Sequence, residues 1–146
     1  YIEKYFQQYP GIKNYMQNTV KFCRENGFVQ TLFGRRIYIP FINEKSGIRK
    51  NFAERSAINA PIQGGAADMI KLAMPKVSKF LKENSLDTKM LLQVHDELVF
   101  EVPEKEIDFI ENEVPKIMTN AHELILKLDV PLKAEVGIGK NWDDAH

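Results

Sequence analysis

Three ionisable residues, His95, Asp96 and Glu97, interrupt an apolar run between residues 91 and 100. The flanking stretches are rich in Leu, Val and Phe, which is typical of strands inside a sheet. Burying unpaired carboxylates is costly, so this placement requires a cation, a partner or a solvent-facing turn. Because hard divalent cations prefer carboxylate oxygens, neighbouring acids at the tip of a hairpin could form half of a two-metal phosphoryl-transfer site. The alternative is a polar β-turn that binds nothing, although His-Asp is a poor two-residue turn compared with Asn-Gly.

Arg55, Asn59 and Gln63 recur at intervals of four residues. On one continuous helix this spacing places all three side chains on the same face. Each side chain can donate hydrogen bonds and is long enough to reach a ligand beside the helix. A solvated helix face produces the same spacing, so the pattern alone supports both a binding row and an ordinary surface.

Arg35 and Arg36 directly follow Gly34. Glycine permits a tight turn, and two adjacent guanidinium groups beside it could bind phosphate oxygens. A surface hairpin with incidental charge explains the segment equally well.

The elements that must position these residues follow from hydrophobic spacing and from helix-breaking residues. In the first part of the chain the pattern predicts one helix, two short strands and a loop, over residues 2–26, 28–32, 36–39 and 43–47. Pro10-Gly11 should break or kink the helix, and Asn26-Gly27 should end it.

Two further helices are expected over about residues 48–59 and 62–84, the first interrupted by Pro61 and the second kinked or broken at Pro75. A tight hairpin then follows, with strands over residues 88–94 and 97–102 and His95-Asp96 at its tip. The remaining pattern predicts a helix over roughly residues 104–128, which Pro115 should interrupt, and a weak strand over residues 130–138.

The charge of the chain is unevenly distributed. The 146 residues contain 20 basic and 20 acidic side chains, and this neutral total at first argues against a nucleic-acid partner. Residues 1–60, however, hold ten basic and four acidic side chains, whereas residues 61–146 hold ten and sixteen. All five arginines precede residue 56. This asymmetry indicates a polyanion partner for the first part of the chain.

Cysteine content and hydropathy exclude several classes of protein. Cys23 is the single cysteine, which excludes an internal disulfide and favours a reducing compartment. Cys23 also has no second cysteine or nearby histidine at zinc-ligand spacing. No stretch approaches the roughly 18 apolar residues of a membrane span, so no membrane partner is expected.

Together, these segments resemble the carboxyl-terminal part of the family A DNA polymerases, of the DNA polymerase I type. Gln93-Val94-His95-Asp96-Glu97-Leu98 is similar to the third polymerase motif of that family. Three further segments are similar to family segments in the same order: Thr31-Leu32-Phe33-Gly34-Arg35-Arg36, Asn59-Ala60-Pro61-Ile62-Gln63-Gly64 with Ala66-Ala67-Asp68, and Val136-Gly137-Ile138-Gly139 through Asn141-Trp142.

The resemblance implies an α+β fold in one fragment of a polymerase domain. Residues 1–50 would be the last part of the fingers, and residues 51–146 would be the second half of the palm, with the antiparallel hairpin packed by helices. It implies a DNA-directed DNA polymerase that uses primer-template DNA, deoxynucleoside triphosphates and two Mg²⁺ ions in the complete enzyme. It also implies a cytoplasmic, nucleoid-associated protein.

The resemblance assigns catalytic roles to the hairpin tip. Asp96 would be a metal-ligand aspartate, Glu97 would support the metal site or the primer end, and His95 would contact the primer terminus.

The resemblance assigns DNA contacts to the basic part of the chain. Gln63 would reach the minor groove of the newest base pairs, Arg55 and Asn59 would contact the primer-template, and Arg35 and Arg36 would touch the DNA backbone. Every correct base pair presents hydrogen-bond acceptors in the minor groove, so donors there can test pairing geometry without reading sequence.

Two family segments are not found in this sequence. One carries a second metal-binding aspartate, in a stretch like Asp-Tyr-Ser-Gln-Ile-Glu, and the other is the fingers helix that holds the incoming nucleotide. The chain also begins at Tyr1 without an initiator Met. We therefore expect a fragment that does not extend primers alone, that would meet nucleotides only through missing amino-terminal segments, and that could self-associate through exposed apolar surface.

Two other functions compete with a polymerase. A metal-dependent phosphohydrolase of the His-Asp type would place His95-Asp96 on a helix with further His and Asp ligands. A non-catalytic DNA-binding module would bind duplexes in a salt-dependent manner, and this binding would survive the Asp96→Ala substitution.

Overall fold

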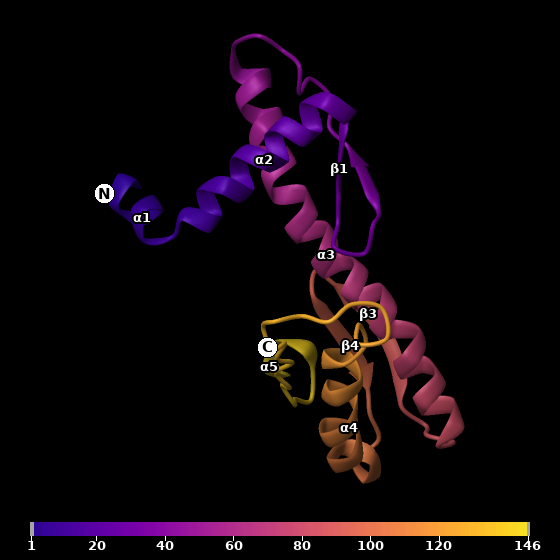
Figure 1. Cartoon of the computed structure of the whole chain (residues 1–146). Coiled ribbons are helices and arrows are strands. Elements are labelled where there is room, and N and C mark those ends of the chain that lie inside the picture. The colour runs from indigo at the N-terminus through magenta and orange to yellow at the C-terminus, as the bar shows by residue number, and fades with distance from the viewer. Residues whose placement is uncertain (1, 146) are drawn as a thin grey trace. The chain divides into compact units, whose positions relative to one another are not determined.

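A computed structural model describes residues 2–145 and shows an α+β fold, as predicted (Figure 1). The helices and strands follow in this order: α1 (Ile2–Gln8), α2 (Pro10–Asn26), β1 (Phe28–Gln30), β2 (Arg36–Tyr38), α3 (Ile48–Glu83), β3 (Lys89–Val94), β4 (Glu97–Glu101), a 3₁₀ turn (Glu104–Glu106), α4 (Ile107–Thr119) and α5 (Trp142–Ala145). The chain divides into two compact units, residues 1–65 and 66–146, which are described in turn.

The first two helices of the amino-terminal unit begin and end where local chemistry predicts. Pro10 stands at the start of α2, where a residue without an N–H group is tolerated, and this separates α2 from α1. Gly27 ends α2 in the left-handed conformation, with φ of 79°, and its N–H donates to the Cys23 carbonyl at 2.7 Å. The predicted break and the predicted stop are both confirmed.

The two short strands of this unit pair in antiparallel fashion, with Phe28 opposite Tyr38 and Gln30 opposite Arg36. Both strands are shorter than predicted. The core beneath them joins α2, the hairpin, the following loop and α3 through six buried residues: Cys23, Val29, Ile39, Ile42, Ala53 and Ala57. Helix α2 crosses the first part of α3 (Figure 1), where the Tyr15 hydroxyl donates to the Ile58 carbonyl at 2.9 Å.

Helix α3 is one helix of 36 residues, and it passes through both Pro61 and Pro75. The predicted interruption at Pro61 is therefore wrong, and Pro75 does not break the helix either. A proline inside a helix removes one backbone hydrogen bond and costs about 3 kcal/mol. Ala57 before Pro61 and Val77 after Pro75 are both fully buried. Packing of these flanking turns against the two cores outweighs the local cost.

In the carboxyl-terminal unit, β3 and β4 pair in antiparallel fashion, and Val94 lies opposite Glu97. Only His95 and Asp96 lie between the strands, so the predicted tight hairpin is confirmed. The pairing is irregular between Met90 and Leu92. The core of this unit joins α3, β4 and α4 through Val77, Leu81, Ile110 and Val114, with Phe100 packed against them.

The last part of the chain departs from the predictions. Helix α4 continues through Pro115 but ends at Thr119, well before residue 128. Residues 130–138 form no strand, because no described strand pairs with them and the alternation in this segment is weak. The short helix α5 was not predicted, although Asn141 is a typical capping residue and its Oδ1 accepts the Asp144 N–H at 3.0 Å.

Among residues 2–145, no helix combines the length and the hydropathy that a membrane crossing requires.

Candidate functional site

The hairpin tip carries the two predicted catalytic residues, Asp96 and Glu97, and the predicted primer contact His95. His95 and Asp96 are exposed, whereas Glu97, the first residue of β4, is partly buried. The turn is tight because only two residues connect the strands, and His95 adopts φ of 51°. This left-handed conformation favours glycine, and a non-glycine residue there costs about 1–3 kcal/mol. His95 therefore occupies a backbone conformation that glycine would adopt with less strain.

The base of the same hairpin is fixed by a buried carboxylate. Glu106 accepts hydrogen bonds from the Asp87 N–H at 3.1 Å, the Thr88 N–H at 2.9 Å and the Thr88 hydroxyl at 2.7 Å. The Thr88 hydroxyl contributes most to lowering the pKa of Glu106, and it acts against burial, which raises the pKa. Sequence reasoning missed this clamp, because its members lie 18 and 19 residues apart.

The hairpin tip suits a hard cation that takes only part of its coordination shell from this chain. Among the described residues, no three His, Cys, Asp or Glu side chains are grouped so that they could hold a metal ion by themselves. Mg²⁺ usually takes only one or two protein carboxylates, together with water and substrate phosphates. The exposed Asp96 can supply one such ligand, so this chain fits part of a magnesium site.

Arg55, Asn59 and Gln63 are exposed and line one hollow of about 520 Å³ in the amino-terminal unit. The shared face predicted from their spacing is therefore confirmed, and it rests on the uninterrupted helix α3. Tyr38 and Phe52 line the same hollow and are 70% and 64% exposed. Sequence reasoning missed both aromatic residues, although Phe52 precedes Arg55 by one helical turn and could have been found from that spacing.

The two adjacent arginines contact different neighbours. The Arg35 Nη2 donates to the Gly64 carbonyl of α3 at 3.1 Å. The Arg36 guanidinium instead lies over the Phe28 ring, 4.7 Å from its centroid. Of the two arginines predicted to bind phosphate, Arg35 therefore contacts α3, and Arg36 contacts Phe28 of β1.

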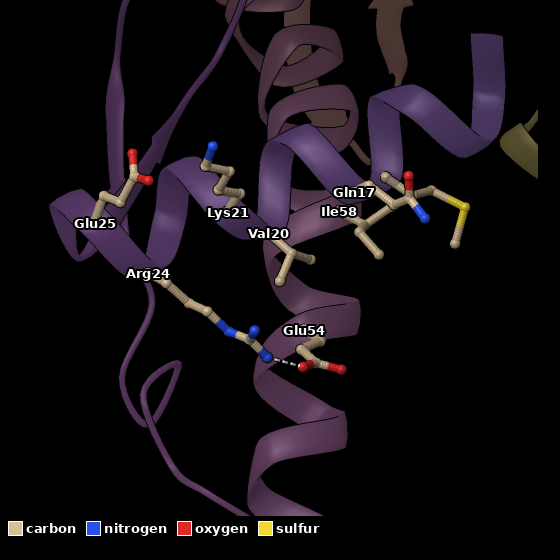
Figure 2. A pocket seen from close by; sticks show the side chains of 8 residues that line it. Gln17, Val20, Lys21, Arg24, Glu25, Glu54 and Ile58 are labelled. Carbon is tan, nitrogen blue, oxygen red and sulfur yellow. Dashed lines mark hydrogen bonds and ion pairs between the residues drawn. The ribbon is translucent and has the colours of Figure 1, made fainter.

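A second hollow, of about 530 Å³, lies between α2 and α3 (Figure 2). Arg24 of α2 and Glu54 of α3 point toward each other there and form an ion pair. None of the residues predicted to bind DNA or metal lines this hollow. We assign Arg24 and Glu54 to the packing of the two helices.

Comparison with known proteins decides the family. The model of the family described as DNA polymerase family A matches residues 1–144. This chain belongs to DNA polymerase family A. The resemblance inferred from the four sequence segments is confirmed over nearly the whole chain.

The most similar relatives include two bacterial polymerases. The chain is 49% identical to DNA polymerase I of Pseudomonas aeruginosa over 146 residues, and 51% identical to DNA polymerase I of Caldicellulosiruptor bescii over 142 residues. These alignments cover 100% and 97% of this chain but only 16% of each relative. The chain therefore spans about one sixth of the length of the family A polymerases that it matches.

A solved structure shares the fold. The POL domain of Pol1 from M. smegmatis, in complex with DNA primer-template and dNTP, superposes with a TM-score of 0.89 and is 44% identical in sequence. The match covers 99% of this chain and 25% of that one. The phosphohydrolase alternative required His95-Asp96 on a helix, and the family A chain instead carries this pair in a turn between two strands.

Proposed function

We propose that this chain forms part of a DNA-directed DNA polymerase that adds deoxynucleotides to a primer by a two-metal mechanism. Residues 1–50 would complete the fingers, and residues 51–146 would form the second half of the palm. One observation carries the proposal: His95, Asp96 and Glu97 stand at the tip of an antiparallel hairpin in a chain that matches the family over residues 1–144.

The hairpin tip is the proposed catalytic part. Asp96 is exposed at the turn and would hold Mg²⁺, with Glu97 beside it at the start of β4. His95, exposed on the same turn, would contact the primer terminus. When bound, Mg²⁺ supplies positive charge that activates the attacking hydroxyl and stabilises the charge that develops on the phosphoryl group. The clamp formed by Glu106 holds the start of β3 and so supports this hairpin.

The exposed row on α3 is the proposed DNA-binding part. Arg55, Asn59 and Gln63 line one hollow and all carry donors, whereas both kinds of base pair present acceptors in the minor groove. Hydrogen bonds to those acceptors would weaken at a mispair, because mispairing displaces them. The related POL domain from M. smegmatis is complexed with primer-template and dNTP, which supports these ligand classes.

A reconstitution experiment tests the proposal. The pure 146-residue chain, given primer-template, dNTPs and Mg²⁺, should not extend the primer, because the second metal-binding segment and the nucleotide-binding helix are not in its sequence. Addition of the amino-terminal segment of the same polymerase should restore extension, and Asp96→Ala should abolish it again.

Extension by the pure chain alone would contradict the assignment of a partial site. A well-folded reconstituted enzyme that binds duplex but never extends it would favour the non-catalytic DNA-binding alternative. Glu101→Ala is the matched control, since Glu101 is an exposed carboxylate at the other end of the hairpin, paired with Lys89 at 3.4 Å.

A further inference from the structure

Gly64 lies at one of the places where the β1–β2 hairpin approaches α3 most closely. A Cβ atom at this residue would lie 2.7 Å from the Thr31 Cγ2 and 2.8 Å from the Ile37 Cδ1, closer than side-chain carbons approach one another. A Cβ atom at the next residue, Gly65, would meet nothing within 4 Å. At Gly64 the hairpin therefore packs directly on the helix backbone, and only a residue without a side chain permits this approach.

Arg35 adds a directed bond to this contact. Its Nη2 donates to the Gly64 carbonyl at 3.1 Å. The turn that carries Arg35 is itself well fixed, since the Thr31 N–H donates to the Arg35 carbonyl at 3.0 Å and the Thr31 Oγ1 accepts the Arg35 N–H at 3.3 Å. The guanidinium thus reaches α3 from a backbone that is already held in place.

The helix is intrinsically weak at this contact. Pro61, Gly64 and Gly65 lie within five residues of one another, and proline and glycine are the two least favourable residues in a helix interior. Tertiary contacts must therefore decide how this turn of α3 is formed and rotated. Gln63 belongs to the same turn, and Ile37, which contacts Gly64, also lines the hollow that Gln63 faces.

We propose that Arg35 is a positioning residue that holds the β1–β2 hairpin on α3 at Gly64 and so fixes the direction of Gln63, rather than a contact to the DNA backbone. This inference rests on the proposed function, because it takes Gln63 as a contact to primer-template. Arg36 provides the contrast, since it carries the same charge at the next position but lies over Phe28.

Hydrogen–deuterium exchange in the 146-residue chain tests the contact between Arg35 and Gly64 without an activity assay. Arg35→Ala should speed the exchange of the amides of residues 62–68 by at least about fivefold, because a hydrogen bond from a charged donor is lost. Arg36→Ala removes the same charge and should leave that exchange within about twofold of the unchanged chain. Equal exchange in the two variants would show that Arg35 does not hold the hairpin on α3 at Gly64.

Kinetics in the polymerase that contains this chain test the link to Gln63. Arg35→Ala should lower the ratio of matched to mismatched primer extension in the same direction as Gln63→Ala, and the double variant should be no worse than Gln63→Ala alone. The salt dependence of duplex binding should keep its slope in Arg35→Ala, whereas a lost phosphate contact lowers that slope by about one unit.

Different results would overturn the positioning role of Arg35 and the DNA-binding role of Gln63. Additive effects of the two substitutions, or a salt slope reduced by about one unit, would overturn the positioning role of Arg35. A Gln63→Ala variant that discriminates mismatches normally would instead overturn the proposed role of the α3 face in binding DNA. The exchange result for the contact between Arg35 and Gly64 would still stand.

Discussion

Two neighbouring glycines of α3 should respond in opposite ways to the same substitution. Gly64 and Gly65 are both buried and both lie inside one helix, so alanine offers the same backbone benefit at each position. Of the two, only Gly64 is a position where an added Cβ atom would run into the β1–β2 hairpin. The pair therefore isolates the cost of that single contact.

At Gly65 the expected change is stabilisation. Replacing a helical glycine by alanine gains about 0.5–1 kcal/mol, because alanine loses less conformational freedom on folding. A Cβ atom there meets nothing within 4 Å, so no steric cost offsets the gain.

At Gly64 the same gain is opposed by overpacking, which typically costs about 1–3 kcal/mol. The Ile37 Cδ1 is the end of a flexible side chain and can move, but Thr31 is buried and stiff. Rotating Thr31 would give up the hydrogen bonds that its Oγ1 accepts from the Phe33 and Arg35 N–H groups, each at 3.3 Å. Because the backbone gain cancels between the two variants, they should differ by about 1–3 kcal/mol.

Urea unfolding followed by far-ultraviolet circular dichroism measures this difference directly. With a urea dependence near 2 kcal/mol per molar, Gly64→Ala should unfold at roughly 0.5–1.5 M less urea than Gly65→Ala. If Gly64→Ala proved as stable as Gly65→Ala, the close contact between the hairpin and α3 would be refuted, and the positioning role of Arg35 would be refuted with it.

Two further substitutions test other contacts. Glu106 has a lowered pKa in the fold, so its stabilising effect is complete above the ordinary glutamate pKa and is lost as the pH falls through the lowered value. Glu106→Gln should therefore flatten the acid-side decline of the urea midpoint, and equal declines in both proteins would contradict this. Tyr15→Phe removes the hydrogen bond to the Ile58 carbonyl at 2.9 Å and should cost about 1 kcal/mol in urea unfolding, whereas an unchanged midpoint would show that this bond contributes nothing.

Features that depend on local chemistry could be predicted from the sequence. Gly27 ends α2 because it adopts the left-handed conformation, and this requires only the residue itself. The hairpin around His95 follows from two apolar runs separated by two polar residues. Pro61 and Pro75 misled the prediction, because the packing that keeps α3 continuous involves residues from distant segments.

The candidate site also has features that follow from local spacing and features that depend on distant contacts. The common face of Arg55, Asn59 and Gln63 follows from spacing alone, once the helix is continuous. The partner of Arg35 could not be predicted, because Gly64 lies 29 residues further along the chain and offers only its backbone carbonyl. Every residue has a backbone carbonyl, so the sequence does not indicate which one accepts a hydrogen bond. The sequence therefore predicts the same role for Arg35 and Arg36.

The most direct measurement of the central claim is the single-turnover rate of nucleotide addition by the proposed polymerase, with this chain as its carboxyl-terminal part. Asp96→Asn keeps the size of the exposed side chain but removes the charge that would bind Mg²⁺. We predict a loss of at least about 10³-fold in rate, equivalent to about 4 kcal/mol of barrier, whereas the control Glu101→Gln should stay within about threefold of the unchanged enzyme. An Asp96→Asn enzyme that adds nucleotides within about threefold of the normal rate would contradict the assignment of Asp96 to the metal site.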